Sequence, residues 1–343
     1  MPASRPVRQR FVERLLRSRE PSVRWRTRVR VLGERRSSPA IRRLEDEVRR
    51  SPRARALLRR GDAFDANHPA RIYRYWQGLH WALTSLADLG YPPDEPSVAP
   101  LVRQAVDVWT APRYERLLSA AESTPGSARF GVPVIAGKPR RCASIQGNAL
   151  LYATELGFVD EKVDRLAELL GRWQWPDGGW NCARGPTAHV SSFMETLVPM
   201  QALATYAQRT GNVRARARAG RAAEVFLRRR LFRRVHGGAV MRRDFVRLHY
   251  PRYWHYDALG GLRGVAAAGR VRDPRAAEAL DWLEDRELVR GGWPADGRYY
   301  RVARSEAPSA EFVDWGRPDR RRANEWVSTD ALAVLASADR LAL

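Results

Sequence analysis

Residues 142–180, which read CASIQGNALLYATELGFVDEKVDRLAELLGRWQWPDGGW, contain the pattern that decides the fold. An apolar stretch ends at Gly157, as expected for a helix, because glycine accepts the left-handed backbone that follows a last helical turn. The next stretch begins with Asp160, a favourable N-cap, and is apolar on one face only. A Gly-Gly pair at Gly178 then predicts a turn. The unit is therefore an apolar helix, a turn, an amphipathic helix and a Gly-Gly turn.

This unit recurs through the chain. The apolar helices are expected to end at glycines spaced 67, 54 and 58 residues apart, namely Gly90, Gly157, Gly211 and Gly269. The amphipathic helices are expected over residues 98–109, 160–173, 214–232 and 273–288. Gly-Gly turns follow three of them, at Gly178, Gly237 and Gly291. A final stretch, 324–340, has the composition of one more apolar helix.

Stacked hairpins of this kind form either an open solenoid or a closed double ring of helices. Helices that are apolar on all sides must be buried, and these are too hydrophobic to line an exposed groove, which favours closure. We therefore expect an all-α fold, an (α/α) toroid or barrel of repeated helical hairpins, in one repeat domain over residues 66–343.

A basic helical extension is expected before the repeats, over residues 1–65. Residues 1–60 contain twenty arginines and six acidic residues, in a chain whose formal net charge is +23. Apolar residues at helical spacing predict three short amphipathic helices here, packed on the toroid. The segment is either a solvated cap or an arm for nucleic acid or an anionic membrane surface. Because the chain has no recognition-helix or zinc-finger spacing, we expect no sequence-specific nucleic-acid partner.

Cysteine content and hydropathy indicate the compartment. Two cysteines in 343 residues exclude a disulfide framework and favour a reducing environment. The first thirty residues contain no apolar signal-peptide stretch, and no apolar run approaches twenty residues. We therefore expect a cytoplasmic protein.

The turns resemble a known motif. Residues 174–180, QWPDGGW, fit the Q-x-x-x-G-x-W pattern of the QW repeat, and residues 287–293, ELVRGGW, match it with Glu in place of Gln. The chain thus resembles the α/α-toroid terpenoid cyclase and prenyltransferase superfamily, which includes squalene cyclases and actinobacterial prenyltransferase or squalene-oxidase repeat proteins. This resemblance implies a toroidal fold, a structural role for the motif, and a small apolar substrate of isoprenoid type.

The catalytic motifs of these families do not transfer to this chain. The sequence has neither the D-x-D-D acid of class II terpene cyclases nor the D-D-x-x-D magnesium motif of class I enzymes. Protein prenyltransferases bind zinc with an Asp two residues before a Cys, whereas Trp180 stands two residues before Cys182. Lanthionine cyclases have His directly after their second Cys, whereas Ala183 follows here.

Two cysteines and a histidine form a candidate metal site. Cys142 begins the second apolar helix, and Cys182 follows a Gly-Gly turn one hairpin later, so both are expected at the same mouth of the toroid. His189 lies just before the third apolar helix. Two thiolates and an imidazole with an open fourth position suit a catalytic zinc ion. The alternative is that the cysteines are small core residues.

The candidate catalytic residues are Asp257, His255 and Glu195. Asp257 ends the stretch HYPRYWHYD, where aromatic neighbours would desolvate it, favour its protonated form and suit it to general-acid work. Glu195 holds a comparable position on the preceding apolar helix. The alternative for Asp257 is an ion pair with Arg252 or Arg247.

Aromatic side chains and one arginine form the candidate substrate-binding set. Aromatic faces stabilise carbocations, and a guanidinium can bind a diphosphate or carboxylate. The alternative for the aromatic residues is core packing. The set consists of Trp180, Phe193, Tyr253, Trp254, Trp293 and Arg252.

The sequence therefore predicts an enzyme that binds an apolar substrate in an aromatic-lined central cavity and carries out an acid-initiated or zinc-assisted cyclisation, elimination or transfer. The alternative is a non-catalytic binding or scaffold module that uses arginine-rich outer faces, such as residues 214–234, for a protein or an anionic surface. Peripheral membrane contact is a third interpretation.

Overall fold

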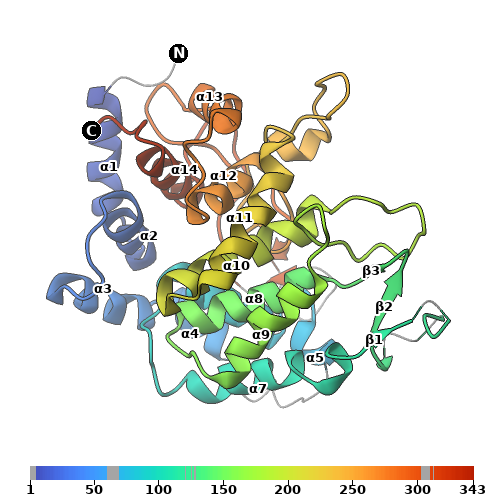
Figure 1. The fold of residues 1–343 in the computed structure, drawn as a ribbon. Helices are drawn as coiled ribbons and strands as arrows, with labels where there is room; N and C mark the ends of the chain where they lie inside the picture. Colours follow the sequence, from blue (N-terminus) through green and yellow to red (C-terminus); the bar gives the residue numbers. More distant parts are fainter. Residues whose placement is uncertain are drawn as a thin grey trace.

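The computed structural model describes residues 5–59, 69–119, 121–124, 126, 129–302, 310–311 and 313–343, and helices make up most of this (Figure 1). The apolar helices of the repeats are α6 (Leu79–Leu89), α8 (Ala143–Glu155), α10 (Phe193–Thr210), α12 (Ala258–Ala267) and α14 (Glu325–Ser337). The amphipathic helices that follow them are α7 (Ala99–Trp109), α9 (Glu161–Trp173), α11 (Val213–Leu227) and α13 (Ala277–Asp285). No helix in the described ranges is both long and apolar enough to cross a bilayer.

The apolar helices form the inner layer of a toroid. Helix α8 packs between α6 and α10, α10 packs on α12, and α12 packs on α14. The amphipathic helices lie outside, with α7 and α9 against α8, α11 against α10, and α13 against α12. The expected all-α toroid of helical hairpins is therefore confirmed.

The N-terminal segment takes part in this architecture. It contains α1 (Arg5–Leu16), α2 (Pro21–Arg26), the π-helical turn η1 (Thr27–Val31), α3 (Pro39–Arg49) and α4 (Pro52–Leu58). Helix α2 and η1 contact α14 on one side, and α2 contacts α6 on the other, so they occupy the gap between the two ends of the inner layer. Helix α5 (Pro69–Tyr73) then leads into α6. The boundary expected at residue 65 lies outside the described residues.

The predicted helix ends agree with the structure. Gly90, Gly157, Gly211 and Gly269 all have φ between 71° and 90°. Asp160 caps α9 by accepting hydrogen bonds from the backbone N–H groups of Lys162 and Val163.

Two amphipathic helices are shorter than the sequence predicts. Helix α11 ends at Leu227, because Arg230 and Leu231 adopt positive φ, which an α-helix cannot contain. The stretch 273–288 divides into the 3₁₀ turn η6 (Pro274–Ala276) and α13.

Short strands occur in the long connections. Strand β2 (Val132–Ile135) pairs in parallel with β1 (Leu117–Leu118) and antiparallel with β3 (Lys138–Pro139). Strand β4 (Arg301–Val302) pairs in parallel with β5 (Ala310–Glu311). Two further 3₁₀ turns are η3 (Pro112–Tyr114) and η5 (Arg243–Val246).

The QW-like turns connect an outer helix to the next inner helix. The Gln174 amide donates to the carbonyls of Gly178 (2.7 Å) and Arg218 (2.9 Å). The Trp180 indole donates to the Leu170 carbonyl (2.9 Å), and the Trp293 indole makes the equivalent bond to Leu283 (2.7 Å). The motif therefore has the structural role that the resemblance implied.

Candidate functional site

A cluster of two thiols and a carboxylate lies at the N-terminal ends of two neighbouring inner helices. Cys142 is the N-cap residue of α8, and Glu195 lies in the first turn of α10. Cys182 belongs to the segment that follows the Trp180 turn and leads into α10. One ligand atom from each of these three residues lies within 4.8 Å of the other two. We call Cys142, Cys182 and Glu195 the thiol–carboxylate cluster.

The packing of the helices explains why these three residues lie close together. Helices α8 and α10 lie against each other along their length, so their first turns are adjacent. The segment that carries Cys182 is held by Asp177, whose carboxylate accepts hydrogen bonds from the backbone N–H (2.7 Å) and the hydroxyl (2.6 Å) of Ser191. The backbone N–H of Ser144 donates to Glu195 Oε2 (3.0 Å), which fixes the carboxylate at the helix end.

Hydrogen bonds within the cluster and burial shift the pKa values of its three groups. The single S–H of Cys182 has two acceptors, Glu195 Oε1 at 3.4 Å and the sulfur of Cys142. The bond from Cys182 lowers the pKa of the Cys142 thiol, whereas the same bond and burial raise the pKa of Cys182. Burial also raises the pKa of Glu195. Both thiols are partly exposed, so a small ligand or ion can reach them.

The donor set suits zinc. Two sulfurs and a carboxylate oxygen are ligands that Zn²⁺ prefers, and three protein ligands leave the fourth position that catalytic zinc sites keep open. His189, the expected third ligand, is outside this set. Its side chain is exposed, and its backbone carbonyl accepts a hydrogen bond from Lys138 (2.6 Å). Glu195, expected as an acid, takes that place.

Asp257 caps α12 and is fully buried. Its Oδ1 accepts the backbone N–H of Gly260 (2.7 Å), and its Oδ2 accepts that of His249 (3.1 Å). The Arg252 Nε atom lies 3.9 Å from Oδ1. These contacts match the arginine-paired role, and the acid role predicted for Asp257 gains no support from them.

His255 is stacked between aromatic rings. Its ring centroid lies 3.9 Å from that of Trp254 and 3.6 Å from that of Tyr299. Burial lowers the pKa of His255 to about 4, so the imidazole is neutral near pH 7. Its Nδ1 atom is 3.1 Å from the carbonyl of Arg252. The ring is outside the thiol–carboxylate cluster.

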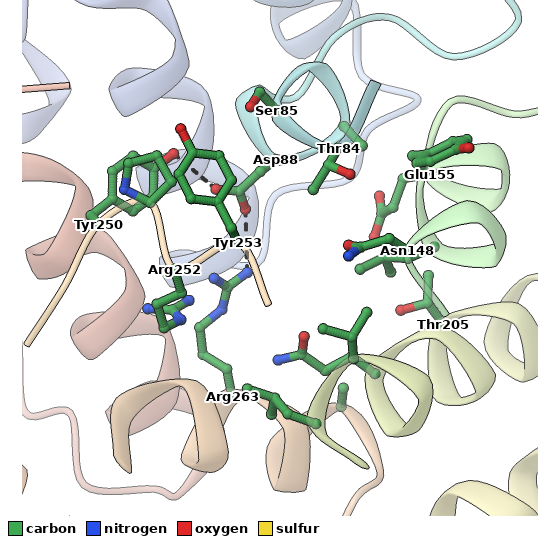
Figure 2. A pocket seen from close by; sticks show the side chains of 18 of the residues that line it. Thr84, Ser85, Asp88, Asn148, Glu155, Thr205, Tyr250, Arg252, Tyr253 and Arg263 are labelled. Atoms are coloured by element: carbon green, nitrogen blue, oxygen red, sulfur yellow. Dashed lines mark hydrogen bonds and ion pairs between the residues drawn. The ribbon is translucent and has the colours of Figure 1, made fainter. Parts of the chain in front are cut away.

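Apart from Trp254, which stacks on His255, the predicted substrate-binding residues divide into two groups. Trp180 and Trp293 are buried in the turns described above, and Phe193 packs against Phe226 in the core. Tyr253 and Arg252, by contrast, line an open cavity of about 300 Å³ between α6, α8, α10 and α12 (Figure 2).

The wall of this cavity is polar and charged. Asp88 Oδ2 accepts hydrogen bonds from Arg26 (2.8 Å) and Tyr250 (2.9 Å), and Arg30 binds Oδ1 (2.9 Å). Behind it, Asp330 pairs with Arg26 and with two arginines of the wall, Arg252 and Arg263. The expected aromatic lining is present in part, because Tyr152, Tyr250 and Tyr253 share the wall with these charged groups. The sequence does contain a signal for these charged groups, because charged residues interrupt the apolar helices, as in LTSLADL of α6 and GGLRGV of α12.

Comparison with known proteins adds the following. No family model and no curated protein matches the chain. Unsaturated glucuronyl hydrolase of Bacillus sp. GL1, described as responsible for the degradation of glycosaminoglycan, has a similar solved structure: TM-score 0.46, 14% identity, 92% of this chain and 84% of that chain covered. A UGL variant with dGlcA-Glc-Rha-Glc gives a TM-score of 0.42 at 15% identity, with the same coverage. Likenesses this remote do not indicate an activity, and the terpenoid family stays a resemblance.

Proposed function

We propose that this protein is a zinc-dependent enzyme whose metal is held by Cys142, Cys182 and Glu195. The observation that supports this most directly is the convergence of the three ligand atoms within 4.8 Å. When bound, zinc would supply a Lewis acid and lower the pKa of a group in the open position. The reaction class is the one predicted from the sequence, a metal-assisted cyclisation, elimination or transfer.

The chain's own residues prepare the site. The Cys142 thiol, whose pKa is lowered, gives up its proton most readily and is the natural first ligand. The Ser144 N–H holds Glu195 Oε2, which leaves Oε1 directed towards Cys182. Cys142, Cys182 and Glu195 would together hold the zinc ion, and because thiolates are the binding form of the two cysteines, binding would release their thiol protons.

The rings of Tyr73 and Tyr75 form an aromatic surface on which an apolar part of a substrate could bind. Burial raises the pKa of the Tyr73 hydroxyl, and Tyr75 and the negative charges of Cys142 and Glu195 raise it further. Its ring contacts that of Tyr75, with centroids 5.2 Å apart, and Tyr75 is 43% exposed. We propose that the apolar or isoprenoid portion of a substrate rests on these rings.

The test is the metal content of purified, tag-free protein by elemental mass spectrometry. We expect about one zinc per chain, and loss of it in the Cys142→Ser, Cys182→Ser double variant. Glu195→Gln should weaken zinc binding at least tenfold, whereas the matched control His189→Gln should keep it. Cobalt substitution should give an intense tetrahedral thiolate spectrum that changes when a small thiol fills the open position.

Two results would overturn the proposal. Metal-free protein that also fails to bind added zinc would return the thiols to a structural role. A loss of zinc in His189→Gln but not in Glu195→Gln would replace Glu195 by the imidazole.

A further inference from the structure

The central cavity of about 300 Å³ is distinct from the thiol–carboxylate cluster. Its wall comes from the later turns of α6, α8, α10 and α12 and from residues 250–253, and it includes neither cysteine nor Glu195. The cluster, by contrast, lies at the first turns of α8 and α10. We propose that this cavity binds a small, neutral, hydroxyl-rich molecule of about the size of a hexose.

The charges around the cavity compensate one another. Asp88 and Asp330 are bound by three arginines of the wall, Arg30, Arg252 and Arg263, and by the buried Arg26 behind it, and Arg252 also pairs with Asp257. Further out, Arg36 pairs with both Glu155 and Glu45. These two separate sets of ion pairs together contain five arginines (Arg26, Arg30, Arg36, Arg252 and Arg263) and five carboxylates (Glu45, Asp88, Glu155, Asp257 and Asp330). The charges of these groups sum to zero, so a neutral ligand fits best, and the Arg252 Nη1 atom, which has no hydrogen-bond partner among the described residues, remains as a donor for such a ligand.

The polar groups that remain offer both donors and acceptors. Gln201 and Gln208 use their N–H groups on the carbonyls of Gly260 (3.4 Å) and Ala267 (2.9 Å), which leaves their amide oxygens as acceptors. The Asn148 Nδ2 atom has no hydrogen-bond partner in the described part of the chain. Asn148 and Thr205 face the same space as Arg263 (Figure 2).

The size and chemistry of the wall narrow the ligand class. A hydroxyl group both donates and accepts, so several hydroxyls can satisfy this mixed wall. A hydrocarbon would leave the Asn148 amide N–H and the amide oxygens of Gln201 and Gln208 without partners. Leu151, Leu197 and Val198 provide an apolar part suited to the C–H faces of a sugar ring. A volume of about 300 Å³ is at the small end for ligand cavities and admits one such ring.

The experiment is isothermal titration of the full chain with single sugars. The neutral probes are glucose, mannose, galactose and myo-inositol, and the charged probes are glucuronate and glucose 6-phosphate. We expect at least one neutral probe to bind with Kd below about 1 mM, and to bind at least tenfold more tightly than its charged counterpart, because a buried charge would lack a partner.

Near-isosteric variants of residues that line the cavity test whether the ligand binds there. Thr205→Val and Gln201→Met each remove one hydrogen-bonding group and should weaken binding about threefold to tenfold. Thr154→Val is the matched control, because Thr154 lies on α8 outside the cavity wall and its hydroxyl already donates to the Leu150 carbonyl (2.7 Å), and it should change Kd less than twofold. Thermal melting confirms that each variant is folded.

Three outcomes would overturn the inference: no probe binds, only the charged probes bind, or Thr205→Val and Gln201→Met leave Kd unchanged. Zinc content is measured on the same samples. Because the cavity variants leave Cys142, Cys182 and Glu195 intact, failure of the sugar site and failure of the metal site are seen separately.

Discussion

His80 lies in the middle of an aromatic cluster, with ring centroids of Trp81 at 4.8 Å, Trp109 at 5.5 Å and Tyr152 at 5.6 Å. It is fully buried, and neither ring nitrogen has a hydrogen-bond partner in the ranges that the structure describes. Burial therefore lowers the pKa of His80 to about 3. The folded protein keeps this imidazole neutral in mildly acidic solution, where the unfolded chain would protonate it.

This difference predicts an acid-sensitive stability. As the pH falls from 6.5 towards 3, only the unfolded chain takes up the proton, so the free energy of unfolding decreases. At pH 4.5 the loss from His80 alone should be about 2–3 kcal/mol relative to pH 7.5. In urea unfolding at the two pH values, His80→Phe should remove this loss, whereas His236→Gln, at an exposed position, should not. Equal losses in wild type and His80→Phe would refute the assignment.

At the thiol–carboxylate cluster, the sequence predicted that the two cysteines lie together but did not predict that Glu195 is the third group. One hairpin of separation was enough to expect Cys142 and Cys182 at one mouth, because equivalent positions of successive repeats are adjacent in space. The third group depends on side-chain direction at the start of α10. There Glu195 turns towards the sulfurs while His189 stays exposed, and spacing alone does not contain that information.

Among the elements, the Gly178 turn is the most tightly constrained of the repeated features. Gly178 has φ of 107°, and a Cβ atom there would lie 2.2 Å from the backbone carbonyl oxygen of Arg221 in α11. Gly237, at the corresponding turn of the next repeat, has φ of 75° with no atom within 4 Å of the added Cβ. Comparing alanine substitutions at Gly178 and Gly237 therefore separates the cost of the steric contact from the cost of a positive φ.

We expect Gly178→Ala to lower the free energy of unfolding by about 3 kcal/mol or more, because α11 must move away from the turn. Gly237→Ala should cost about 1–2 kcal/mol, the cost of positive φ alone. Chemical denaturation of both variants checks this. Equal losses would show that the α11 contact contributes nothing.

Element identity was largely predictable, because apolar periodicity and terminal glycines are local signals. The extents of α8, α9 and α10 follow from these signals. The early end of α11 does not, since its sequence continues with arginines that are good helix formers. Tertiary packing of Leu231 and Phe232 into the core determines that end.

For the whole molecule, Arg26, which is fully buried, links the two ends of the inner layer. Its guanidinium donates to Asp330 of α14, to Asp88 of α6 (2.8 Å) and to the hydroxyl of Thr329 (3.1 Å). The two ends of the inner layer are therefore joined through one side chain of the N-terminal segment. Composition hid this role, because Arg26 is one of twenty arginines in the first sixty residues.

Arg26→Met should lower the free energy of unfolding by about 3–5 kcal/mol, because it leaves buried carboxylates short of a partner. Arg43→Met, at an exposed position of α3, should change it by less than about 0.5 kcal/mol. Thermal and urea unfolding measure both. A loss below 1 kcal/mol in Arg26→Met would mean that the remaining arginines suffice for closure.

The joint between Arg26 and Asp330 also has a consequence for biosynthesis. The two residues are 304 positions apart, and Arg8 and Glu287 in a second joint are 279 apart. At ribosomal speeds of about 5–20 residues per second, the N-terminal helices wait on the order of 15–60 s before their carboxylate partners emerge. Trp25 does not share this delay, because its indole donates to Glu45 and its ring lies against Gly90, so α2 can pack on α3 and α6 long before α14 is made.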